Sequence, residues 1–292
     1  MKIKHVELTV APPEPHMVGD GFRVHNFIPS TYRLDMHRMD PFIMLDYNAK
    51  TTLPPSDVPR GVGVHPHRGF ETVTVAYKGK VAHHDSAGNS GVIGEGGVQW
   101  MTAASGILHK EYHEHNFSRQ GGEFQMVQLW VNLPARFKMS APKYQGIAPE
   151  QIVRHTLPEN AGSIGVIAGN YMGVKGAAST FTELHMLDVR LNAGGFAGFS
   201  FPAKFNTILL AVEGRVEING SQILETDHLA LFENTGEDFS IKAMDNAVLL
   251  LLSGEPISEP IAAHGPFVMN TREELVQAFR DLHNGKFGSL AD

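Results

Sequence analysis

The chain has 292 residues, enough for one large domain or two of ordinary size, and a formal net charge of −7. This charge supplies no basic surface for a nucleic-acid backbone or an anionic membrane, so direct binding to either is not expected. The absence of cysteine excludes disulfides, iron–sulfur clusters and thiolate metal sites, which leaves His, Asp and Glu as candidate metal ligands.

The first ten residues include two lysines and a histidine, and they lack the continuous apolar core of a signal peptide. No run of about eighteen apolar residues follows elsewhere in the sequence. We therefore expect a soluble intracellular protein, located in the cytoplasm or, in a eukaryote, also in the nucleus.

Short runs rich in Val, Ile, Leu, Phe and Thr recur along the chain between Gly, Pro, Asn and Asp residues. This spacing is typical of an all-β sandwich or barrel. The clearest predicted strands are residues 72–77, 98–102, 123–132, 207–218, 228–232 and 247–252. Trp100 and Met101 are expected in the core. Residues 247–252 are apolar on both faces, which favours a buried strand, while the periodicity alone also fits a helix.

One helix is predicted near the end of the chain. Thr271 and Glu274 have the spacing of a capping box, and Gly285 suits the C-terminal end of a helix. Between them lies an apolar stripe at helical spacing, formed by Leu275, Ala278, Phe279 and Leu282. We expect this helix to pack on the outer surface of a barrel.

Two histidines separated by a single residue, His65 and His67, stand in an extended segment at residues 61–73. Because successive side chains of a strand alternate faces, both imidazoles point to the same side. His109 and Glu111 repeat this spacing farther along the chain. Three imidazoles and one carboxylate suit iron, zinc, copper or nickel better than calcium or magnesium. These four residues are therefore candidate ligands for one transition metal.

Two other histidine pairs compete with this set. His113 and His115 have the same spacing but no second pair downstream, and we interpret them as part of a solvated loop. His83 and His84 are adjacent, so their rings would lie on opposite faces of a strand. We interpret them, with Asp85, as turn residues.

Two charged residues beside the first motif leave further alternatives open. Glu71 has the strand parity of His65 and His67 and is an alternative carboxylate ligand. Arg68 and Glu71 could also orient the ligands through hydrogen bonds, or form salt bridges at the surface.

The sequence resembles itself at a spacing of roughly 130 residues, which is the length of a domain. Residues 75–81 and 210–216 share the order strand, charged residue, glycine, basic residue, strand, and Ser105-Gly106 corresponds to Thr235-Gly236. This repeat predicts two barrels: residues 1–135, which carry the metal site, and residues 136–292, which include the C-terminal helix. Residues 133–143 are expected to form a linker. The alignment replaces the four candidate ligands by Ser200, Pro202, Phe239 and Ile241, so the second barrel is expected to lack a metal.

The motifs at residues 65–73 and 98–111 resemble those of the pirin family within the cupin superfamily. Further landmarks of that family occur at residues 40–46, 128–134 and 265–271. The resemblance implies an all-β bicupin fold, with two antiparallel β-barrel (jelly-roll) domains and a few short helices. It also implies one metal, usually taken to be iron, at positions that match His65, His67, His109 and Glu111. On this basis Glu111 is preferred to Glu71 as the carboxylate ligand.

The resemblance further implies quercetin 2,3-dioxygenase activity at a mononuclear non-haem iron, Fe(II) or Fe(III), with other divalent metals as alternatives. The expected partners are a flavonol-like small molecule and dioxygen, which cleaves the heterocycle with loss of carbon monoxide. In this interpretation Glu111 is also catalytic, as the base that accepts the proton of the flavonol's 3-hydroxyl.

A second interpretation is an iron-dependent redox sensor or regulatory protein that binds a transcription factor or a metabolic enzyme, because relatives are described in both roles. Oxidation of Fe(II) to Fe(III) adds a positive charge near the surface that such a protein partner would meet. Neither interpretation requires direct binding to nucleic acid or to a membrane.

Overall fold

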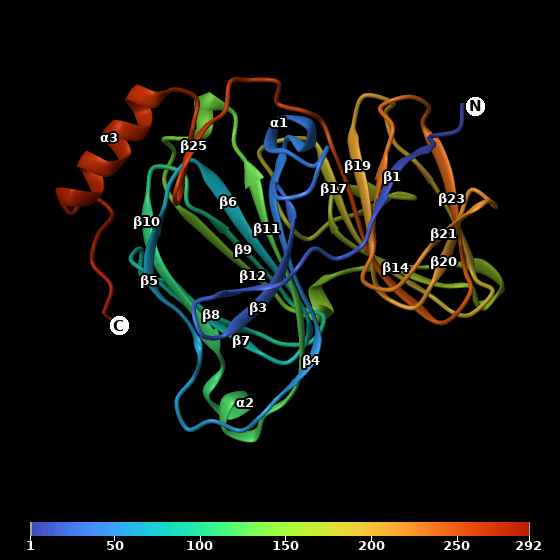
Figure 1. Cartoon of the computed structure of the whole chain (residues 1–292), viewed down its shortest axis with the longest axis horizontal. Helices are drawn as coiled ribbons and strands as arrows, with labels where there is room; N and C mark the ends of the chain where they lie inside the picture. The colour runs from blue at the N-terminus through green and yellow to red at the C-terminus, as the bar shows by residue number, and fades with distance from the viewer. Residues whose placement is uncertain (1, 292) are drawn as a thin grey trace. The chain divides into compact units, whose positions relative to one another are not determined.

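The computed structural model describes residues 2–291 of the chain (Figure 1). The chain divides into two compact units, and neither is continuous in sequence. The 13–149 unit comprises Pro13–Pro149 and the segment from Ile257 onward. The 150–256 unit comprises Glu150–Pro256 and the segment up to Pro12. Each unit contains a seven-stranded and a four-stranded sheet whose strand pairs are antiparallel.

The 13–149 unit contains the predicted ligands. Its seven-stranded sheet has the order β12 (Lys143–Ile147), β9 (Val98–Thr102), β6 (Phe70–Lys78), β11 (Gly122–Asn132), β4 (Phe42–Leu53), β3 (Phe22–Ile28) and β2 (His16–Val18). Its four-stranded sheet has the order β5 (Gly61–His67), β10 (Ile107–His113), β7 (Val81–Asp85) and β8 (Ser90–Ile93). The smaller elements are α1 (Met36–Met39), α2 (His115–Gln120), η1 (Ala135–Phe137), β25 (Ala262–His264), β26 (Phe267–Met269) and α3 (Arg272–His283).

The two sheets of the 13–149 unit share an apolar core that includes Phe22, Ala76, Ile93 and Phe124. Strand β10 shows how the sequence builds it, because alternate residues of this strand are buried from Ile107 to His113. The buried residues of β10 include His109 and Glu111, which were predicted to lie on one face of the strand. The alternation of the strand therefore directs these groups into the interior of the unit.

The 150–256 unit repeats the arrangement. Its seven-stranded sheet has the order β1 (Val6–Val10), β22 (Leu229–Phe232), β19 (Asn206–Glu213), β24 (Ala247–Gly254), β17 (Leu184–Leu191), β14 (Gly162–Ala168) and β13 (Arg154–Thr156). Its four-stranded sheet has the order β18 (Phe196–Ser200), β23 (Asp238–Ala243), β20 (Val216–Ile218) and β21 (Gln222–Leu224). The remaining elements are β15 (Asn170–Tyr171), β16 (Val174–Lys175) and η3 (Pro158–Asn160). The short η2 (Pro149–Gln151) begins at the last residue of the 13–149 segment.

The predicted all-β fold with two jelly-roll units is confirmed, although the sheets of each unit stay separate and do not close into continuous barrels. Most predicted strands correspond to observed strands. The predicted run 207–218 is two strands, β19 and β20, because the chain turns at Gly214, which has a φ of 71°. Residues 247–252 form part of β24, a strand rather than a helix. Trp100 and Met101 are fully buried, as expected.

The C-terminal helix is also confirmed. The side chain of Thr271 accepts a hydrogen bond from the backbone of Glu274, and the Glu274 carboxylate accepts one from the backbone of Thr271. Leu275 and Ala278 are buried against Phe267 of β26 and Phe287. Helix α3 contacts β25 and β26, so it belongs to the 13–149 unit (Figure 1).

The compact units differ from the continuous segments 1–135 and 136–292 expected from the sequence. The chain termini are exchanged between the units, and residues 133–143 are part of the 13–149 unit. Lys138, in the expected linker, is 2% exposed, and its Nζ donates to the backbone oxygens of Gly69 and Val268 and to Oδ1 of Asn132. These three acceptors only partly compensate the burial of the amino group, because desolvation still lowers the pKa of Lys138 to about 7. The basic composition of the segment does not reveal this burial. Within residues 2–291, no helix is long and apolar enough to cross a membrane.

Candidate metal centre

The predicted ligands lie on two neighbouring strands of the four-stranded sheet. Strands β5 and β10 are antiparallel, with His65 paired to His109 and His67 paired to Ile107. The register shifts between His109 and Glu111, where β10 carries an irregularity. Pairing therefore brings together two motifs that are far apart in the sequence.

Three imidazoles converge at this point of the sheet. The ring centroid of His65 lies 4.9 Å from that of His67 and 4.2 Å from that of His109, and the centroids of His67 and His109 lie 4.8 Å apart. One nitrogen from each ring can be chosen so that all three lie within 4.8 Å of one another. This spacing allows three imidazoles to bind one transition-metal ion.

Backbone carbonyls favour one tautomer for two of these rings. Nδ1 of His65 lies 2.8 Å from the oxygen of Gly63, and Nδ1 of His67 lies 3.4 Å from the oxygen of Pro266. A carbonyl only accepts, so each Nδ1 carries a hydrogen, and in the neutral ring Nε2 then keeps the lone pair. That is the state a metal-binding histidine requires.

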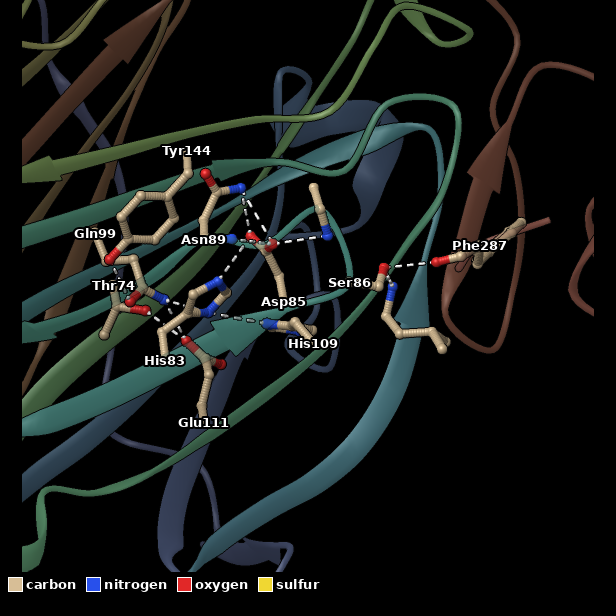
Figure 2. A network of polar contacts seen from close by, with 12 residues as sticks. Thr74, His83, Asp85, Ser86, Asn89, Gln99, His109, Glu111, Tyr144 and Phe287 are labelled. Atoms are coloured by element: carbon tan, nitrogen blue, oxygen red, sulfur yellow. Dashed lines mark hydrogen bonds and ion pairs between the residues drawn. The ribbon is translucent and has the colours of Figure 1, made fainter. Parts of the chain in front are cut away.

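A chain of side chains produces the same state in His109 (Figure 2). Oδ2 of Asp85 accepts a hydrogen bond of 3.2 Å from Nε2 of His83, so Nδ1 of His83 is an acceptor. That Nδ1 lies 3.5 Å from Nδ1 of His109, which therefore carries a hydrogen. Nε2 of His109 is buried and has no hydrogen-bond partner among the described residues. An unpaired imidazole nitrogen beside two others fits a metal ligand.

Burial keeps two of the imidazoles, those of His67 and His109, in the form that binds a metal. Desolvation lowers the pKa of His67 and of His109 well below the ordinary value for histidine, and the neighbouring imidazoles lower both further. The neutral rings are available as ligands without loss of a proton near neutral pH. The donor set therefore fits a transition metal of the imidazole-binding kind.

Glu111 takes a different position from that of the three imidazoles. Its carboxylate groups with nitrogens of His109 and His83, again within 4.8 Å, and it is not part of the His65, His67 and His109 group. Nε2 of Gln99 lies between the members of this second group, 2.8 Å from Oε1 of Glu111 and 3.3 Å from Nδ1 of His83. Because an amide already bridges them, these residues form a hydrogen-bond network rather than a separate metal site.

The same network fixes the orientation of Glu111. Nε2 of Gln128 donates to Oε2 over 3.1 Å, and Gln99 donates to Oε1. The hydroxyl of Tyr144 donates to Oε1 of Gln99 over 3.3 Å, which fixes the orientation of that amide (Figure 2). The Glu111 carboxylate is thus held by two amides at the edge of the imidazole group.

A cavity of about 170 Å³ opens beside these residues in the 13–149 unit. His65, His67, Glu111 and Gln128 form its polar wall. The other lining residues are mainly apolar: Val18, Phe22, Val24, Met44, Val62, Met126 and Trp130, together with Asp46. A small organic molecule in this cavity would meet the imidazoles and the carboxylate directly.

Two sequence interpretations of the competing histidines are wrong. His83, expected in a turn, is fully buried in strand β7. The expectation of opposite faces holds, since His84 stacks instead on the half-buried Tyr112. His113, expected in a solvated loop, is a buried residue of β10 that contacts Phe22 and Phe124. These positions become visible only when β7 is paired with β10. In the sequence, the one sign of strand β7 is that His83 and Asp85 are separated by a single residue, as are two residues on the same face of a strand.

The two charged residues of the first motif lie outside the imidazole group. Glu71 is buried and accepts a hydrogen bond of 2.7 Å from Oγ1 of Thr102, and burial raises its pKa to about 7. Arg68 is also buried, and its Nη1 lies 2.9 Å from Oδ2 of Asp281 on α3. A surface salt bridge is therefore the wrong description of Arg68.

The role of His83 can be tested through metal affinity. We expect His83→Leu to weaken metal binding by about 10–100-fold, because His109 loses the acceptor that fixes its tautomer. His83→Gln, whose carbonyl can accept the same hydrogen, should restore part of the affinity. Competition with a chelator measures the difference, and His84→Ala on the outer face is the matched control. Equal affinities in His83→Leu and His84→Ala would contradict the role.

Sequence comparison places the whole chain among known proteins. The family description Pirin matches residues 21–131, and the Pirin C-terminal cupin domain matches residues 186–288. A Pseudomonas aeruginosa protein with the provisional name quercetin 2,3-dioxygenase is 46% identical over 272 residues, which cover 93% of this chain and 94% of that protein. A pirin-like protein of Caulobacter vibrioides is 38% identical, over 96% of this chain and 98% of that protein.

Solved structures give the same result. The crystal structure of a quercetin 2,3-dioxygenase from Acinetobacter baumannii is similar with a TM-score of 0.93 and 44% identity, over 99% of this chain and 100% of that chain. Both parts of the chain thus match the same family, in sequence and in fold. The chain belongs to the pirin family.

Proposed function

We propose that this protein is a flavonol 2,3-dioxygenase that acts on quercetin or a related molecule at one mononuclear iron. The observation that carries the proposal is the convergence of three imidazoles, His65, His67 and His109, beside a cavity that also contains a carboxylate. The names of the relatives in Pseudomonas aeruginosa and Acinetobacter baumannii support the reaction and the substrate class.

In this proposal His65, His67, His109 and Glu111 hold the metal. When bound, the metal supplies a Lewis acid that favours the substrate oxyanion and a centre for reaction with dioxygen. Glu111 accepts the proton of the flavonol's 3-hydroxyl, while Gln99 and Gln128 hold its carboxylate in place.

The apolar side chains of the cavity have a separate part in the proposal. Phe22 and Trp130 pack against the aromatic rings of the substrate and exclude water from the reacting hydroxyl. Dioxygen cleaves the heterocycle, and carbon monoxide leaves.

Metal analysis and oxygen uptake test the proposal together. Protein purified without added metal is expected to contain about one iron per chain and to consume oxygen with a flavonol while it releases carbon monoxide. If the protein contains another divalent metal and still consumes oxygen with a flavonol, only the identity of the metal in the proposal has to be revised. If the protein consumes no oxygen with a flavonol when it contains iron or another divalent metal, the dioxygenase proposal is contradicted. Binding of a protein partner that depends on oxidation of the metal would then support a regulatory role.

The base role of Glu111 has its own test. We expect Glu111→Gln to lower kcat by about 10²–10⁴-fold, because the amide cannot accept the substrate proton. Metal occupancy should fall much less, since three imidazoles remain. Turnover and metal content are measured on the same samples, with the exposed Glu123→Gln on β11 as the control. Equal losses of turnover and metal would leave Glu111 as a ligand only.

A further inference from the structure

The cavity beside the imidazoles contains a second carboxylate that the proposed chemistry does not use. Asp46, on strand β4, lines the cavity and is 9% exposed. It pairs with Gln128 of β11, which in turn pairs with Thr74 of β6. Asp46 therefore lies one strand spacing, about 5 Å, from the residue that donates to Glu111.

Among residues 2–291, a hydrogen-bond donor reaches only one oxygen of Asp46. Nδ2 of Asn26 donates to Oδ1 of Asp46 over 2.7 Å, and the described residues supply no hydrogen bond to Oδ2. By contrast, both oxygens of Glu111 have amide donors. A largely buried carboxylate with a free oxygen in a cavity is costly unless a partner in that cavity satisfies it.

Burial also changes the proton affinity of this group. Desolvation raises the pKa of Asp46, and the hydrogen bond from Asn26 and the electrostatic effect of His16 only partly offset this rise. A carboxylate with a raised pKa shares a proton more strongly with a weakly acidic hydroxyl. A phenol or an enol has such a hydroxyl.

The rest of the cavity defines the body of the ligand. Phe22 and Trp130 supply aromatic side chains to the lining, and Met44 and Met126 add thioethers that pack well against rings. Its volume of about 170 Å³ is smaller than that of clefts that enclose drug-sized ligands, which hold about 300 Å³ or more. The cavity thus accommodates a compact ring system, or part of a larger one.

We propose that Asp46 is a substrate-binding residue that accepts a hydrogen bond from a substrate hydroxyl, and that the cavity selects aromatic ring systems, whole or as part of a larger molecule, with at least two separated hydroxyl groups. One hydroxyl lies on the Glu111 side, and the second reaches Asp46. This inference rests on the proposed function, because it describes the substrate of the same site. A flavonol meets the requirement through hydroxyls on different rings.

Two probes that differ by one hydroxyl test the selection. The hydroxyls of 2,7-dihydroxynaphthalene are too far apart to chelate one metal ion, and 2-naphthol lacks one of them. Isothermal titration calorimetry of the full-length protein as purified should give a dissociation constant at least about 10-fold lower for the dihydroxy compound, as expected for a hydrogen bond to a charged group. In Asp46→Asn the ratio should fall to within about 3-fold, and Asp46→Glu should keep most of it.

A purely structural role of Asp46 makes a different prediction. If Asp46 only holds Asn26, Asn26→Ala should mimic Asp46→Asn, and both variants should weaken the two probes equally. Our proposal requires that Asn26→Ala keeps the wild-type ratio. A wild-type ratio near one, or an unchanged ratio in Asp46→Asn, overturns it.

The outcome is independent of catalysis, since binding is measured without turnover. Wild-type protein that separates the probes but consumes no oxygen with flavonols would contradict only the proposed function. Flavonol turnover combined with unchanged selectivity in Asp46→Asn would contradict only the role of Asp46.

Discussion

His109→Ala is expected to reduce the metal content from about one ion per chain to near zero. His109 belongs both to the group of three imidazoles and to the network around Glu111. Its Nε2 is buried without a partner among residues 2–291, so it is the nitrogen that the metal would satisfy. The loss should exceed the 10–100-fold effect expected for His83, because a ligand and not its support is removed. Metal analysis after purification, and after incubation with ferrous salt, measures the effect.

His113→Ala provides the matched control for this substitution. His113 is a buried histidine of the same strand and the same face, but it belongs to neither group of ligand atoms. Both variants remove a buried imidazole, so both should lose stability through the cavity that forms. Metal retained in His109→Ala, or lost equally in His113→Ala, would contradict the assignment of the centre.

Strand alternation is the part of this centre that the sequence alone predicts well. His65 with His67, and His109 with Glu111, have the spacing of residues on one face of a strand, and the β5–β10 pairing brings the two motifs together. Helix α3 was also predicted from local features, a capping box and an apolar stripe. Local patterns were sufficient wherever the environment of a residue depends on its own strand or helix.

Features that depend on the pairing of distant strands could not be predicted. His83 lies in a polar segment that resembles a turn. It is buried and can accept a hydrogen bond from His109 only because β7 pairs with β10. The repeat in the sequence aligned His65 with Ser200 and His109 with Phe239, yet Phe239 pairs with Phe199. The structure therefore places Phe199, one residue before Ser200, at the position that corresponds to His65. Phe199 and Phe239 are part of the apolar core of the 150–256 unit.

The exchange of the chain ends between the units was likewise invisible to composition. The apolar stripe of α3 predicts that it packs on a surface but does not say which one. Arg68 determines part of this packing surface. Its guanidinium forms an ion pair with Asp281 of α3 and lies 4.7 Å from the ring centroid of Phe287. The residue next to His67 therefore connects the C-terminal segment to the strand that carries two of the predicted ligands.

Asp281→Ala is accordingly expected to destabilise the 13–149 unit by about 3–5 kcal/mol, because it leaves the buried Arg68 guanidinium without its anion. Nε of Arg68 keeps its hydrogen bond to the oxygen of Ser105, which satisfies only part of the charge. Thermal unfolding of the unit should shift by on the order of 10 °C. Hydrogen exchange should become faster in α3, which carries Asp281.

Two further variants separate the ion pair from a general loss of packing. The double substitution Arg68→Met and Asp281→Leu replaces both charges by apolar side chains of similar length and should recover most of the stability. Asp245→Ala removes an anion from an exposed pair with Arg215, which solvent screens, so little change is expected. A double variant no more stable than Asp281→Ala would show that the packing of α3, rather than the charge on Arg68, holds the C-terminal segment beside β5.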